Sequence, residues 1–80
     1  MSRLPLLTYR KLIRLLRTAG FVFDRQAKGS HEIWWNPQTR QRVTVPNHPG
    51  VLARGTLQAI IRQTGLTINE FVNLDKLDKS

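Results

Sequence analysis

Residues 30–46 decide the fold, and they read SHEIWWNPQTRQRVTVP. Ser30 to Trp35 is rich in β-branched and aromatic side chains and predicts a strand. Residues 36–39 form a strong turn signal, and Gln41 to Val45 alternates apolar and polar side chains like a half-buried strand. Pro46 then ends the strand, because proline has no backbone N–H to donate to a neighbouring strand. The stretch therefore predicts an antiparallel hairpin.

Upstream of the hairpin, the sequence predicts a helix and a further strand. Thr8 to Ala19 places apolar residues at helical spacing, and Gly20 follows as a typical helix stop. The aromatic and β-branched start of residues 21–26 predicts a strand, and residues 27–29 predict a turn. Because these connections are short, we expect the three strands to form an antiparallel meander.

Downstream of the hairpin, residues 47–50 are expected to form a loop before a second helix from about Thr56 to Thr64. Thr67 and Glu70 have the spacing of a capping box, which predicts a short third helix. The polar residues after it are expected to fray.

The predicted order of elements is α-β-β-β-α with a short C-terminal helix. We expect an α+β fold in which helices cover one face of a three-stranded antiparallel sheet. A chain of 80 residues has room for one domain, so we treat residues 1–80 as a single domain. Its core is expected at about residues 8–73, with a frayed tail at 74–80.

Charge is the strongest signal in the composition. Thirteen Lys and Arg against five Asp and Glu give a net charge of +8. Most of these cations are arginine, whose planar guanidinium matches the geometry of phosphate. A field of this strength attracts polyanions, and RNA or another nucleic acid is the commonest such partner.

Other classes of function are excluded or disfavoured by what the sequence lacks. It contains no cysteine, which excludes disulfides, thiolate metal sites and thiol nucleophiles. No apolar run approaches the roughly 20 residues that a membrane-spanning helix needs. We therefore expect no membrane partner, a cytoplasmic location, no cofactor and no metal.

Two groups of basic residues are candidates for binding RNA. Arg10, Arg14 and Arg17 stand at i, i+4 and i+7, so they form one stripe on the first predicted helix. Like charges at this spacing destabilise a helix, which favours a phosphate or an acidic partner over a merely solvated surface. In the second group, Lys28, Gly29 and Ser30 open the second strand, where exposed amides beside a lysine form a candidate phosphate cradle.

His31 is the candidate catalytic residue. RNA carries its own nucleophile, the 2′-hydroxyl, so a histidine that moves protons and cations that stabilise the phosphate are sufficient for cleavage. Strand alternation places His31 with Ile33 and Trp35, on a side that faces either the core or the solvent. A structural histidine is thus an equal alternative. Glu32 should point away from His31.

The sequence leaves the roles of His48 and of the two tryptophans open. His48 lies in a proline-flanked loop. It is either a second proton-transfer group or an ordinary exposed histidine. Trp34 and Trp35 are consecutive and point to opposite faces, so one fills the core and the other is exposed or at an interface.

Three segments resemble the HicA toxin family: residues 29–34 (GSHEIW), 43–48 (VTVPNH) and 55–65 (GTLQAIIRQTG). The resemblance extends from about Thr8 to Phe71. It implies a double-stranded-RNA-binding-domain-like fold and an mRNA interferase, an endoribonuclease that cleaves mRNA with the histidine of the Gly-Ser-His motif, here His31. It also implies a HicB-type antitoxin that covers the active site. It implies no settled role for His48.

Two other functions stay open at this point. A non-catalytic RNA-binding module of the same shape fits the charge and the order of elements equally well, and it would keep its biological effect without His31. An adaptor that docks an acidic protein would show no salt-dependent RNA affinity beyond nonspecific binding.

Overall fold

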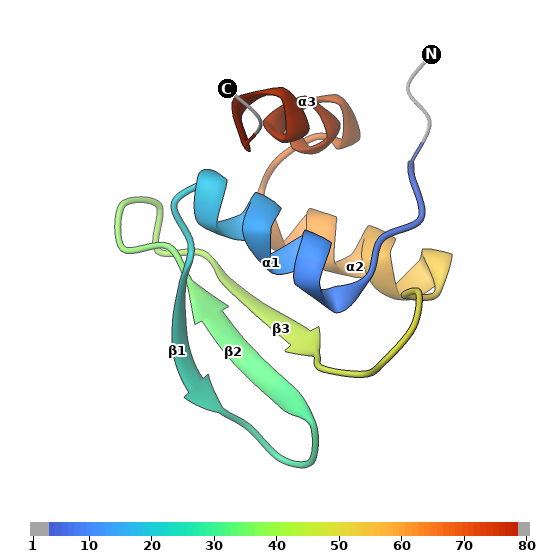
Figure 1. The fold of residues 1–80 in the computed structure, drawn as a ribbon. Coiled ribbons are helices and arrows are strands. Elements are labelled where there is room, and N and C mark those ends of the chain that lie inside the picture. Colours follow the sequence, from blue (N-terminus) through green and yellow to red (C-terminus); the bar gives the residue numbers. More distant parts are fainter. Residues whose placement is uncertain (1–3, 79–80) are drawn as a thin grey trace.

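The computed structural model describes residues 4–78, and it contains the three-stranded sheet that the sequence predicts. The elements are α1 (Tyr9–Thr18), β1 (Val22–Gln26), β2 (His31–Trp35), β3 (Arg42–Pro46), α2 (Arg54–Thr64) and α3 (Ile68–Asp78). Both strand pairs are antiparallel and the spatial order is β1-β2-β3. Figure 1 shows α1 and α2 over one face of the sheet, with α3 beyond them. The predicted α+β architecture is confirmed.

The core lies between the sheet and the helices. Trp34 of β2 stands opposite Val43 of β3, and both side chains are buried on the helix side of the sheet. The helices contribute leucine and isoleucine at helical spacing, as the pattern predicts. The largest fully buried side chains are Trp34, Phe21, Phe71, Leu12, Leu15, Leu16, Leu57, Ile60, Val43 and Val45. No helix within residues 4–78 is both long enough and apolar enough to cross a membrane.

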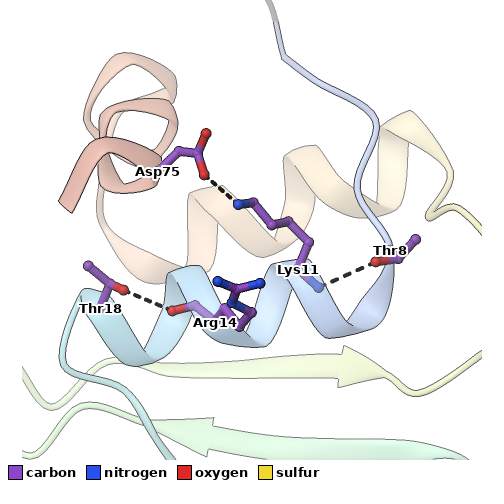
Figure 2. A network of polar contacts seen from close by, with 5 residues as sticks. All are labelled: Thr8, Lys11, Arg14, Thr18 and Asp75. Carbon is purple, nitrogen blue, oxygen red and sulfur yellow. Dashed lines mark hydrogen bonds and ion pairs between the residues drawn. The ribbon is translucent and has the colours of Figure 1, made fainter. Parts of the chain in front are cut away.

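The C-terminal helix is longer than the sequence pattern indicates. Its start is the predicted capping box: the Thr67 N–H donates to Glu70 Oε1 at 2.8 Å, and the Glu70 N–H donates to Thr67 Oγ1 at 3.1 Å. The expected fraying from residue 74 differs from the structure, in which α3 continues to Asp78. The reason is tertiary, because Leu74 is buried and Asp75 forms an ion pair with Lys11 of α1 (Figure 2). Residues 79–80 lie outside the described part of the chain.

Both edge strands of the sheet, β1 and β3, depart from regular strand geometry or pairing. Between Phe23 and Arg25 the register of β1 shifts by a bulge, and every residue of β1 is exposed. On the opposite edge, the backbone N–H of Thr44 donates to the side-chain oxygen of Gln63 in α2 at 2.9 Å.

One buried carboxylate joins three parts of the fold. Glu32 of β2 is 6% exposed and points away from His31, as strand alternation predicts. It accepts hydrogen bonds from the Tyr9 hydroxyl of α1 at 2.7 Å and from Trp34 Nε1 at 2.9 Å. Its second oxygen accepts from Asn47 Nδ2, in the loop after β3, at 3.1 Å. Burial raises the pKa of Tyr9 to about 12, and the hydrogen bond to Glu32 and the charge of that carboxylate act in the same direction.

This network predicts an unusual alkaline titration. Tyr9 is the single tyrosine of the chain, so the rise of tyrosinate absorbance reports on it alone. We expect a midpoint near pH 12 in the folded protein, and a lower one in Glu32→Gln because the negative charge is gone. Since the folded-state pKa lies above the ordinary value of about 10, the stability that Tyr9 contributes is complete below pH 10 and is lost as the pH rises through about 12.

The control is Glu70→Gln, which alters an exposed carboxylate in the α3 cap and should leave the Tyr9 midpoint unchanged. A wild-type midpoint near 10 would contradict the network.

Candidate active site

The turn between β1 and β2 presents the Gly-Ser-His segment. Its backbone is closed by the Ala27 N–H, which donates to the His31 carbonyl at 2.8 Å, and by the His31 N–H, which donates to the Lys28 carbonyl at 3.3 Å. The side chain of Gln26 adds bonds to the carbonyls of Gly29 at 3.1 Å and His31 at 3.0 Å. Gly29 has φ of +67°, a left-handed conformation that favours glycine. Lys28 and Gly29 are exposed at the tip.

His31 lies on the face of the sheet that the helices leave uncovered. Along β2 the side chains alternate, with Glu32 and Trp34 buried and His31 exposed. This excludes the core alternative for His31 that the sequence left open. Nδ1 of His31 lies 3.3 Å from the Lys28 carbonyl oxygen. A carbonyl oxygen can only accept, so in the neutral ring the proton sits on Nδ1 and leaves the lone pair of Nε2 available as a base.

His48 returns to the same end of the sheet. The register pairs His31 with Pro46, which brings the loop after β3 beside the β1–β2 turn. The ring centroids of His31 and His48 are 6.4 Å apart and the rings are nearly perpendicular, at 80°. Ser30 Oγ lies 3.3 Å from Nε2 and 3.4 Å from Nδ1 of His48. Sequence reasoning had the signal for this pairing in the strand register, but treated the two histidines separately.

A shallow depression extends from His48 to the start of α1. Its lining includes Arg10, His48 and Asn47, together with Tyr9, Thr8, Pro49 and Gly50. Arg10 therefore places a positive charge beside His48, and Lys28 lies two residues before Ser30 in the β1–β2 turn.

Arg10 and Arg17, two of the three arginines in the predicted stripe on α1, have different surroundings. Arg10 lines the depression beside His48, whereas the Arg17 guanidinium lies over the Trp34 ring, 5.3 Å from its centroid. The intervening turn of the helix takes part in a local polar network (Figure 2), in which Thr18 Oγ1 donates to the Arg14 carbonyl at 3.0 Å. Equal spacing along a helix does not give these arginines equal surroundings.

The open face of the sheet carries one of the two tryptophans. Trp34 is buried and Trp35 is half-buried on the His31 side, where the Arg42 guanidinium lies 4.9 Å from its ring centroid. The expectation of one core and one surface tryptophan is therefore confirmed. Across residues 4–78, no three His, Cys, Asp or Glu side chains are grouped so as to hold a metal ion.

Comparison with known proteins gives one family. The model of the HicA toxin of bacterial toxin–antitoxin systems matches residues 9–66, from the first residue of α1 to just beyond α2. The matched segment contains the whole sheet and both histidines, whereas α3 lies outside it. A search of curated proteins gives no significant match.

The positions of Arg10 and Arg17 predict different effects of removing one charge. We expect Arg10→Ala to weaken RNA binding several-fold and to reduce the slope of log affinity against log salt by about one. Arg17→Ala should instead lower the free energy of unfolding by about 0.5–1 kcal/mol, because a cation–π contact is lost. Fluorescence anisotropy with a labelled oligonucleotide at several salt concentrations, together with urea unfolding, measures both.

Each variant is the control for the other, since both remove one guanidinium from the same helix. Equal losses of affinity would show that α1 acts only through the net charge of the protein.

Proposed function

The chain belongs to the HicA toxin family of bacterial toxin–antitoxin systems, and from this premise we propose that it is a metal-independent endoribonuclease that cleaves mRNA. The observation that carries the proposal is the exposed His31, held by the Lys28 carbonyl at a basic glycine turn. A histidine with a free ring nitrogen on an open face can reach a proton of a bound polymer.

The chemistry follows from the substrate. Nε2 of His31 accepts the proton of a 2′-hydroxyl, and the 2′-oxygen attacks the adjacent phosphorus. The bond from phosphorus to the 5′-oxygen breaks, leaving a 2′,3′-cyclic phosphate and a 5′-hydroxyl end. Lys28 and the amides near Gly29 and Ser30 offset the charge that builds up on the phosphate oxygens. Each step moves a proton or stabilises an anion, so the mechanism requires no metal.

The partner follows from the family and from the charge. A toxin–antitoxin family implies an antitoxin, and we propose one of the HicB type that covers His31. A net charge of +8 favours an antitoxin with an acidic surface, because complementary charge accelerates association. The proposed substrate, mRNA, would be met in the cytoplasm.

Replacement of His31 tests the function. We expect wild-type protein to cleave a mixed RNA and to arrest growth on expression. His31→Ala should lose about 10²–10⁴-fold in cleavage rate, the usual contribution of a general acid or base, and should not arrest growth. Gel analysis of purified protein and growth curves measure the two effects.

Thr44→Ala serves as the control, since it changes an exposed residue of the neighbouring strand. If folded His31→Ala remained fully toxic, the non-catalytic RNA-binding module would be favoured.

The nucleophile and the metal requirement are tested on one substrate pair. We expect cleavage to persist in excess EDTA and to yield 2′,3′-cyclic phosphate ends. A 2′-deoxy substitution at the cleaved position should abolish cleavage while largely preserving binding, because the nucleophile is gone and the phosphates remain. Efficient cleavage of the deoxy substrate, or activity restored only by a divalent ion, would contradict the mechanism.

A further inference from the structure

The proposed reaction leaves one proton without a donor. As the bond from phosphorus to the 5′-oxygen breaks, its electron pair moves to that oxygen, which must take up a proton to leave as a hydroxyl. We propose that His48 is a second catalytic residue and donates this proton as a general acid opposite His31. The inference rests on the proposed function and adds a residue to it.

The first support is the separation of the two rings. An in-line displacement places the attacking and leaving oxygens on opposite sides of phosphorus, so the two proton transfers need groups on two sides of one phosphate. The rings of His31 and His48 are both exposed, come from different segments and stand 6.4 Å apart between centroids. This spacing is too large for a direct hydrogen bond between the rings, and it places both of them within reach of one phosphate group.

The second support is the difference between the hydrogen-bond partners of the two rings. His31 faces the carbonyl of Lys28, which only accepts, and so holds the tautomer that makes Nε2 a base. His48 faces the hydroxyl of Ser30, which both donates and accepts. Ser30 Oγ lies almost equally far from the two ring nitrogens of His48, so in the protonated ring either N–H can donate to the hydroxyl and the other can serve the leaving oxygen. After the transfer, the same hydroxyl can donate to the neutral ring.

The third support is the way the His48 loop is fixed. The Asn47 N–H donates to the Ser30 carbonyl at 2.9 Å, and the Asn47 side chain donates to the buried Glu32. These bonds attach the loop to the strand that carries His31, so the two rings are placed by one structural unit. Arg10 lines the depression beside His48, so a cation lies next to the proposed acid.

The protons balance over the reaction. His31 gains the proton of the 2′-hydroxyl and His48 loses one to the 5′-oxygen. The pair therefore ends with its protonation states exchanged, and solvent restores them.

The test uses a leaving group that needs no acid. A substrate with sulfur in place of the bridging 5′-oxygen, at the position where the wild type cleaves, expels a thiolate that leaves without protonation. We expect His48→Ala to cleave the ordinary RNA at least 10²-fold more slowly than the wild type but the sulfur-bridged RNA within a few-fold of it. His31→Ala should be slow on both substrates, because the base is still needed.

His48→Gln is the matched variant, since it retains a hydrogen bond to Ser30 but cannot donate a titratable proton. We expect it to behave like His48→Ala. Full activity of either variant on ordinary RNA, or equal losses on both substrates, would overturn the acid role. A different result would contradict the proposed function itself: wild-type protein that cleaves neither the ordinary nor the sulfur-bridged RNA.

Discussion

The buried carboxylate of Glu32 is the constraint on which the other features depend. A buried charge is costly unless its oxygens are hydrogen-bonded, and here three donors from three segments meet on one side chain. Tyr9 connects it to α1, and Asn47 connects it to the loop after β3. Since Glu32 is the residue next to His31, the same interaction that fixes the core side of β2 also fixes the position of His31 on its open side. The position of His48 depends on it through Asn47.

Much of the sheet could be predicted because its signals are local. Period-two alternation and an Asn-Pro turn are properties of neighbouring residues, and they specify a hairpin without reference to the remainder of the chain. These local signals did not specify which face of the sheet is buried under the helices. On β2, apolar content favours the side of Ile33 and Trp35, yet the helices cover the side that carries Glu32 and Trp34. The donors that make burial of Glu32 acceptable are Tyr9 and Asn47, which are distant in sequence.

The candidate site shows the same division. His31 and the glycine turn were identified from adjacent residues, whereas the approach of His48 depends on where a loop closes after the strands have paired. Helical spacing placed three arginines in one stripe, but it carried no information on what lies beside each of them. Arg17 meets the buried Trp34, and Lys11 meets Asp75 on a helix that was expected to end earlier.

The sheet edges have a consequence for how this chain can meet other proteins. An edge strand with free backbone groups is a template for strand addition. At β1 the bulge interrupts the ladder at Asp24, and at β3 the outward N–H of Thr44 is already occupied by Gln63. Neither edge presents a regular, unoccupied row of donors and acceptors. Recognition of this domain by β-augmentation, in which a partner adds a strand to a sheet edge, is therefore disfavoured. A partner is instead expected to contact the side chains of the open face and of the turns.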